Sequence, residues 1–441
     1  MGCAGHQSAG LWTHPGDRST SYTDLSYWTD LARLLERGGF DALFLADVLG
    51  VYDVHGGSRD TAVRAGAQVP LIDPMLTIPA MAAVTERLGF AVTSSVTYEH
   101  PWATARRFTT LDHLTNGRVG WNVVTSYLAS AARGYGMGEQ VPHDRRYDLA
   151  EEYVEVCAAL WEGSWEDGAV VHDSASATFT DPSKVHDVDH DGEFFSVHGP
   201  FLCEPSPQRT PVVFQAGASA RGLELGGRIA EVVFVSGPTT AAVRTMVDGV
   251  RAAAQAAGRD RGDIKVLTML TPVLADTDDA AWAKHADYVA HSSREGAMAL
   301  FGGWTGVDLS GLDPDAPLEH VENDATRTAL AAFTTADPHA AWTVGSVAEF
   351  VAVGGRGPVL VGSPTTVADE LERWCEEADV DGFNLAYATS PGTFTDVVDL
   401  LVPELRARGR ILEPEGATLR ERLVGGTARL SNSSWVGKHR K

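Results

Sequence analysis

The sequence has few cysteines and no long apolar run, and each shortage excludes a class of protein. Its four cysteines lie far apart and form no C-x-x-C pair. This spacing indicates neither a zinc site nor a dithiol redox centre and favours a reducing, cytoplasmic setting. No stretch of about 18 apolar residues occurs, and no basic segment followed by an apolar one opens the chain, so we predict neither a membrane span nor a signal peptide.

Basic residues are also scarce. The 441 residues include 35 Lys and Arg against 59 Asp and Glu, which gives a formal net charge of −24. Such a surface repels nucleic acid and anionic membranes, so neither is an expected partner. A small anion can still bind, because backbone N–H groups and a few arginines act over short distances.

Two chemical signatures are missing. The segment Gly217-Ala218-Ser219 continues with Ala220-Arg221, so it is not the G-x-S-x-G turn of serine hydrolases. The run from His186 to Asp191 is rich in His and Asp but has no helical pair of histidines, and we read it as a polar turn. We therefore expect neither a nucleophilic serine nor a metal.

Apolar strands alternate with helices along most of the chain, which predicts an α/β fold with a parallel sheet. We count seven strands, one short of a (β/α)8 barrel. The expected organisation is one barrel domain over residues 1–430, interrupted by insertions at about 165–208 and 277–361, and followed by a disordered tail at 431–441. The first insertion is expected to be rich in β-structure.

Polar side chains gather where the predicted strands end, at the edge of a parallel barrel where ligands bind. Asp47 ends one strand and Thr93 lies at the end of the next. Asn122 lies inside the apolar strand VGWNVVT and must find hydrogen-bond partners when buried. It either faces the barrel interior and a planar ligand, or bonds to a neighbouring loop.

A second polar group lies at two predicted helix starts. His143 and Tyr147 are four residues apart and share one helix face, beside free backbone N–H groups. They suit a phosphate or a flavin, or they are a surface histidine and a core tyrosine. Ser219 in QAGASARG is a further anion-binding candidate, or an ordinary turn residue.

The chain resembles a known family over residues 24 to 423. The segments that carry the resemblance are GRVGWNVVTS, HDRRYDLAEEYVEVCAALWEGSWEDGA, HDGEFFSVHGPF, SPQRTPVVFQAGASARG, VGSPTTVADELERW, DGFNLAY and TLRERL. They resemble the reduced-FMN-dependent monooxygenases of the bacterial luciferase-like superfamily. Within it, they are most similar to the branch of nitrilotriacetate monooxygenase component A, the EDTA and dibenzothiophene-sulfone monooxygenases and pristinamycin synthase.

The resemblance implies a luciferase-like TIM barrel that uses FMNH2 and O2 on a small amine, sulfone or heterocycle. It also implies a separate NAD(P)H:flavin reductase and a homodimer. It leaves the catalytic acid or base unknown. It assigns FMN contacts to six residues: Asp47, Thr93, Asn122, His143, Tyr147 and Ser219. The alternatives are a deazaflavin-dependent oxidoreductase of the same superfamily, or a truncated flavin-binding protein without turnover.

One departure accompanies the resemblance. Family members begin with an apolar strand before a loop that contains Gly-His, whereas this chain starts MGCAGHQSAGLW. The first barrel strand is therefore expected to be missing, which explains the count of seven and predicts strand edges without a partner.

Overall fold

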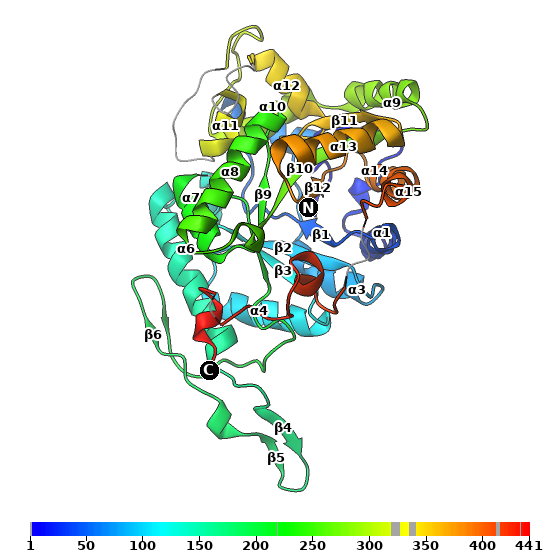
Figure 1. The fold of residues 1–441 in the computed structure, drawn as a ribbon. Helices are drawn as coiled ribbons and strands as arrows, with labels where there is room; N and C mark the ends of the chain where they lie inside the picture. Colours follow the sequence, from blue (N-terminus) through cyan, green and yellow to red (C-terminus); the bar gives the residue numbers. More distant parts are fainter. Residues whose placement is uncertain (1, 218, 319–326, 335–340, 412–414, 433) are drawn as a thin grey trace.

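The computed structural model describes residues 2–217, 219–318, 327–334, 341–411, 415–432 and 434–441. Within them, eight strands form one parallel sheet in the order β1-β2-β3-β8-β9-β10-β11, and β12 also pairs with β10 (Figure 1). The strands are β1 (Ala42–Leu45), β2 (Gly89–Ser95), β3 (Val119–Val124), β8 (Val212–Gln215), β9 (Val232–Val235), β10 (Lys265–Leu274), β11 (Val359–Gly362) and β12 (Gly382–Leu385).

Helices surround these strands, as the alternating pattern predicts. They include α1 (Leu25–Gly38), α4 (Pro101–Leu114), α6 (His143–Ala158), α7 (Ala220–Ile229), α8 (Thr240–Ala256), α13 (Pro364–Ala378) and α15 (Val402–Ala407). Several begin at a side-chain cap: Ser219, Thr239 and Ser363 each accept a hydrogen bond from the N–H three residues further on. Such caps satisfy backbone donors that the helix leaves free and fix where each helix starts.

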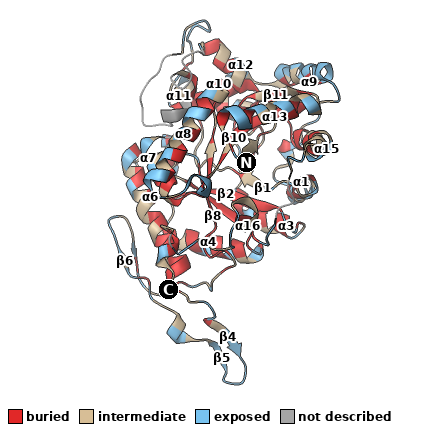
Figure 2. Cartoon of the chain, viewed as in Figure 1, coloured by how far each residue is buried: buried red, intermediate tan, exposed pale blue. Residues whose placement is uncertain are grey.

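The side-chain alternation of β3 separates the helix-facing layer from the barrel interior. Trp121 is fully buried, and its ring lies 5.6 Å from Phe108, 6.1 Å from Tyr153 and 5.8 Å from Trp161, all in the helical layer. Because successive side chains of a strand point to opposite faces, Asn122 faces the other way. Figure 2 shows the buried strands at the centre of the molecule.

The first insertion forms two short antiparallel pairs, in agreement with its predicted β-structure. These are β4 (Val170–Asp173) with β5 (Thr178–Thr180), and β6 (His190–Asp191) with β7 (Ser196–Val197). Figure 1 shows that this excursion extends away from the barrel. Glu152 of α6 holds the turn between β6 and β7 by accepting hydrogen bonds from the backbone N–H groups of residues 193–195.

The second insertion is helical and also contains a strand that the pattern does not predict. It holds α9 (Asp278–His291), α10 (Arg294–Thr305), α11 (Arg327–Thr334) and α12 (Val344–Ala352). The extra strand β11 pairs with the second half of the ten-residue β10, while β12 pairs with the first half. The long strand therefore pairs with a barrel strand through its first half and with a strand of the insertion through its second half.

The barrel has a seam between β1 and β12. Among the described residues, β1 pairs only with β2 and β12 only with β10. In agreement with the prediction, no strand is found between residue 2 and β1, where Cys3 makes only an isolated bridge to Leu71. One side of each seam strand is therefore left without a ladder partner.

The last residues pack against the end of α6. The segment 431–441 is predicted to be disordered, yet Val436 is buried and the Arg440 guanidinium donates to the Glu162 carboxylate at 2.8 Å. Glu162 is fully buried, so this pair places a counter-charge on a carboxylate that water does not reach. In the described part of the chain, no helix is long and apolar enough to span a bilayer.

Candidate functional site

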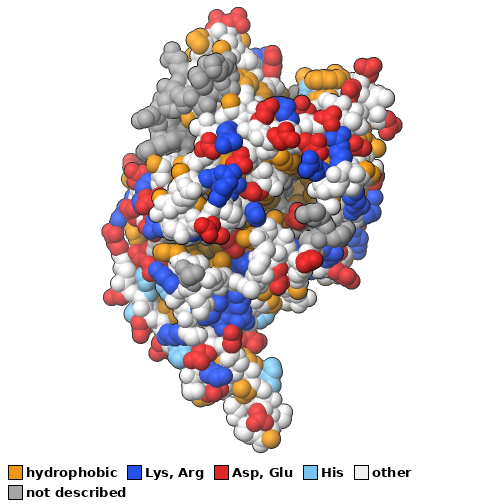
Figure 3. Space-filling model, in the orientation of Figure 1, with side chains coloured by type: hydrophobic (Ala, Val, Ile, Leu, Met, Phe, Trp, Pro, Cys, Tyr) orange, Lys and Arg blue, Asp and Glu red, His pale blue; other side chains and the backbone are white. Residues whose placement is uncertain are grey.

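One large cavity runs along the barrel, from the carboxyl ends of the strands to their amino ends, where Asp41, Lys265 and Asp381 line it. Its volume is about 990 Å3, within the usual range for small-molecule sites. All six residues predicted from the sequence line it: Asp47, Thr93, Asn122, His143, Tyr147 and Ser219. Figure 3 shows acidic and basic side chains intermixed on the outer surface in that view, so the negative net charge forms no single patch there.

Asn122 and Thr93 form a polar pair on neighbouring strands. The two residues are directly paired in the parallel register, and Asn122 Nδ2 donates to Thr93 Oγ1 at 2.9 Å. Asn122 Oδ1 is buried and has no hydrogen-bond partner among the described residues. An unpaired buried acceptor is costly, so a ligand that donates a hydrogen bond here would be stabilised.

Asp47 follows β1 and lines the same cavity. Burial, and then the nearby Asp73, raise the pKa of its carboxyl to about 6. The carboxyl therefore changes charge close to neutral pH. In its ionised form it accepts hydrogen bonds only, which suits hydroxyl or N–H donors of a ligand.

His143 and Tyr147 lie in the first turns of α6, with their ring centroids 5.1 Å apart. Both are 6% exposed and line the cavity, so the alternative of a surface histidine does not hold. His143 Nδ1 lies 2.7 Å from Asp144 Oδ1, which orients the ring. Among the described residues no side chain caps α6, so its first N–H groups remain available to an anion.

Ser219 caps α7 beside the Tyr147 hydroxyl. Its Oγ accepts from the Gly222 N–H at 3.1 Å. A Cβ at Gly217 or at Gly222 would come within 2.9 Å of the Tyr147 hydroxyl oxygen. These two glycines therefore allow the start of α7 to approach α6 closely. The nearby Gln215 Oε1 is also buried without a partner among the described residues, and it lies against α7, 3.1 Å from where a Cβ at Gly226 would be.

A tyrosine network that the sequence did not reveal forms another part of the wall. The Tyr52 hydroxyl lies 2.9 Å from both Gln68 Oε1 and the Tyr127 hydroxyl, and it accepts from Trp304 Nε1 at 3.1 Å. Gln68 Nε2 donates to the His6 carbonyl at 2.5 Å. Burial raises the pKa of both tyrosines, which keeps their hydroxyls protonated at neutral pH. The partners lie up to 252 residues apart in the sequence, so no local motif indicates them.

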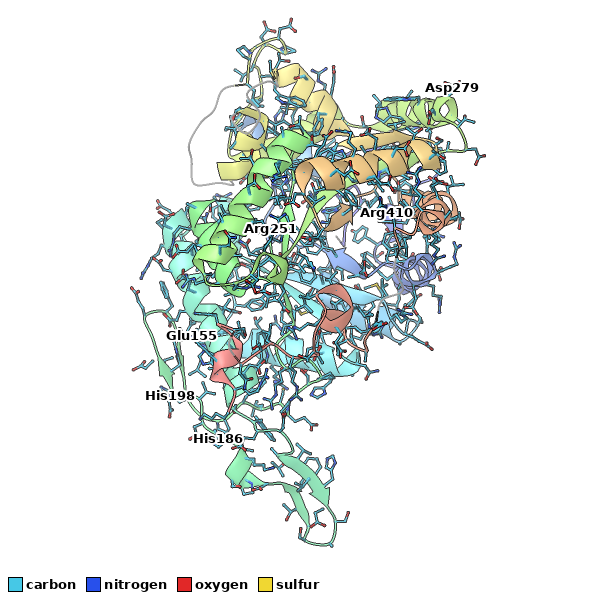
Figure 4. The ribbon with its side chains drawn as sticks, in the orientation of Figure 1. Glu155, His186, His198, Arg251, Asp279 and Arg410 are labelled. Atoms are coloured by element: carbon cyan, nitrogen blue, oxygen red, sulfur yellow. The ribbon has the colours of Figure 1, made fainter. Side chains whose placement is uncertain are left out.

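The histidines of the excursion take part in ordinary side-chain pairs. His186 Nε2 lies 2.8 Å from Glu166 Oε1, and His198 Nδ1 lies 3.3 Å from Asp189 Oδ1. Figure 4 shows His186 and His198 on the excursion, outside the barrel. In the described ranges no three His, Cys, Asp or Glu side chains are grouped to hold a metal ion.

The geometry defines a class of protein: a parallel α/β barrel with a ligand cavity at the carboxyl ends of its strands. Comparison with known families gives a sharper result, because the model of the family described as luciferase-like monooxygenase matches residues 9–382. The chain belongs to this family and is a flavin-dependent monooxygenase. The predicted family and luciferase-like TIM-barrel fold are thereby confirmed.

Individual relatives match over almost their whole length. The dimethyl-sulfide monooxygenase of Hyphomicrobium sulfonivorans is 53% identical over 96% of this chain and 89% of its own. The crystal structure of DmoA from the same organism is 51% identical, with a TM-score of 0.92 over 100% of this chain and 94% of that one. The long-chain alkane monooxygenase of Geobacillus thermodenitrificans is 47% identical over 100% of this chain and 96% of its own. A riboflavin lyase, solved with modified FMN and riboflavin, is 36% identical with a TM-score of 0.92 over 100% and 98%.

Proposed function

We propose that this enzyme is the oxygenating component of a two-component system, which uses FMNH2 and O2 to oxygenate a small organic substrate. A separate NAD(P)H:flavin reductase would supply the FMNH2. One oxygen atom enters the substrate and the other leaves as water, with two electrons from the reduced flavin. The observation that carries the proposal is that six polar residues from β1, β2, β3, α6 and α7 line one cavity.

The cavity fits FMN by tests that do not depend on the family. Asn122 Oδ1 is a buried acceptor without a partner among the described residues, and the flavin ring and ribityl chain carry N–H and O–H groups that can donate to it. The glycines at 217 and 222 allow the start of α7 to lie directly beside the Tyr147 hydroxyl, so that one ligand group can contact both helix starts. Reduced FMN, when bound, supplies the electrons and activates O2.

The side chains have distinct tasks in this proposal. Ser219, Tyr147 and His143, with the N–H groups at the start of α6, hold the phosphate and the adjoining ribityl chain. Asp47, Thr93 and Asn122 accept and orient the ring and the rest of the ribityl chain. Trp304, Tyr52 and Tyr127 close part of the wall with large side chains and exclude water from the reacting atoms.

The proposal is tested by anaerobic titration of the apoprotein with reduced FMN, followed by turnover under isotopically labelled O2 with thioethers, sulfones and amines. Tyr147→Phe and Ser219→Ala should each weaken reduced-FMN binding about tenfold, the loss expected for one hydrogen bond to a charged group. Thr277→Ala removes a similar helix cap from α9, outside the cavity, and should leave binding unchanged.

The proposal would be overturned if the wild type does not bind reduced FMN. It would also be overturned if Tyr147→Phe and Ser219→Ala both bind reduced FMN as tightly as the wild type does. Substrate oxidation with a reduced deazaflavin product and without O2 consumption would instead establish the deazaflavin-dependent alternative. We also propose a homodimer, on the family resemblance alone. Sedimentation analysis tests it, and a single monomeric species would contradict it.

A further inference from the structure

Arg356 lines the same cavity, on the short loop between α12 and β11. It takes part in no ion pair and no hydrogen bond among the described residues. Its Nε atom is buried without a partner. Its guanidinium carbon lies 5.5 Å from the centre of the Trp304 ring, so an aromatic face supports the charge on one side.

The loop that carries Arg356 is seated rigidly. Gly354 and Gly355 have φ angles of 88° and 72°, which favour glycine. The Gly354 N–H donates to the buried Ser8 Oγ at 2.9 Å. A Cβ at Gly357 would lie 2.4 Å from the Met269 carbonyl oxygen of β10, so the backbone packs directly on the sheet. Rigid seating of this kind holds a side chain in a fixed position toward a ligand.

Among the described residues, no carboxylate forms an ion pair with Arg356 or shifts its pKa. The groups that interact electrostatically with Arg356 are the hydroxyls of Tyr52 and Tyr127. Burial raises the pKa of both tyrosines, so they stay neutral. The pKa of His6 is lowered first by burial and further by Arg356, so its ring is neutral as well. Burial lowers the pKa of Arg356 itself, but an arginine remains charged in a protein. A charged guanidinium without a counter-ion in a partly apolar cavity is costly unless a ligand supplies one.

We propose that Arg356 anchors the substrate and selects substrates that carry an oxyanion, such as a carboxylate, sulfinate or sulfonate, next to an apolar body. The planar guanidinium can bind two oxygens of such a group at once. Trp304, Tyr52 and Tyr127 provide apolar surface for the remainder of the substrate. This deepens the proposed function, because the substrate must share the cavity with the flavin.

The experiment uses benzoate and benzyl alcohol as probes of similar size, one anionic and one neutral. Their binding to the apoprotein is measured by calorimetry, without flavin and without turnover. We expect benzoate to bind at least tenfold more tightly than benzyl alcohol. Arg356→Met should weaken benzoate binding about 10- to 100-fold, the range for a charged hydrogen-bonded pair. Arg356→Lys should recover part of it, since lysine keeps the charge but not the planar geometry.

Two controls locate the probe and keep the tests independent. Arg244→Met removes an arginine from the exposed side of α8, where it pairs with Asp248, and should change nothing. Ser219→Ala should weaken reduced FMN but leave benzoate binding intact. The inference is overturned if wild type binds both probes equally, if benzoate depends on Ser219 rather than Arg356, or if Arg356→Met weakens reduced FMN as much as benzoate. Loss of flavin binding in the wild type would overturn the proposed function alone.

Discussion

Asn122 donates to Thr93 across neighbouring strands at 2.9 Å and keeps its own carbonyl oxygen buried without a partner among the described residues. Apolar strands surround the pair. The two side chains therefore satisfy one hydrogen bond between them and leave one acceptor available to a ligand. This pair and related arrangements in the cavity and the core can each be tested by substitution.

The double variant Thr93→Val/Asn122→Leu tests whether the pair serves the ligand or the fold. Replacing both partners by apolar groups of similar shape is nearly neutral for stability, so the free energy of unfolding should change by less than about 1 kcal/mol. Reduced-FMN affinity should fall about tenfold or more, because the buried acceptor is lost. Urea unfolding and anaerobic titration measure the two quantities. A large loss of stability with unchanged flavin affinity would assign the pair to the fold.

Gly222→Ala should disturb the contact between α7 and α6. The added Cβ would come within 2.9 Å of both the Tyr147 hydroxyl oxygen and the Gly217 carbonyl carbon, so one of the two segments must shift. We expect weaker reduced-FMN binding and a lower melting temperature. Gly134→Ala is the matched control, because it lies in helix α5 (Ala129–Gly134) with nothing within 4 Å of the new Cβ. Equal behaviour of the two variants would contradict the proposed phosphate site at the starts of α6 and α7.

Asp47 should make flavin binding depend on pH. Its pKa is raised from 3.8 to about 6, so the carboxyl is neutral below that pH and ionised above it. Donors of a flavin bond best to the ionised form, so affinity should increase as the pH rises from 5 to 7, and Asp47→Asn should flatten the profile. The free energy of unfolding of the apoprotein should change in the opposite direction. The native carboxyl holds its proton more tightly than the unfolded one does, so this free energy should decrease as the pH rises from about 4 to 6. A profile that Asp47→Asn leaves unchanged would rule out this role.

Arg440→Ala should destabilise the protein although it lies next to the C-terminus. The change leaves the fully buried Glu162 carboxylate without its counter-charge, which costs about 3 to 5 kcal/mol for a buried pair. Thr210 Oγ1 still donates to Glu162, so Glu162→Gln/Arg440→Ala should recover much of the loss. Chemical denaturation measures both. A change within about 0.5 kcal/mol would show that the terminal segment contributes nothing, as its predicted disorder implies.

The sequence predicted those site residues that depend on local rules. Strand ends and helix starts placed Asp47, Thr93 and Ser219, because parallel strands bring their carboxyl ends to one edge and helices begin at caps. Arg356 and Tyr52 were not predicted. They reach the cavity from an insertion and a loop, and their neighbours come from distant parts of the chain, so only tertiary packing brings them together. The flanking glycines of Arg356 were a local sign that its loop is held in a special conformation.

The seam between β1 and β12 also sets how fast the backbone exchanges hydrogen with solvent. Each N–H of β3 lies between two paired neighbours, whereas the amides of β1 and β12 that face the seam have no carbonyl opposite them among the described strands. Residues of both seam strands line the cavity, so solvent reaches those amides without unfolding. In deuterated water we expect alternate amides of 42–45 and 382–385 to be labelled within seconds, while their neighbours retain protons like those of β3. Amides along the seam would then exchange fast, while the rest of the barrel core stays protected.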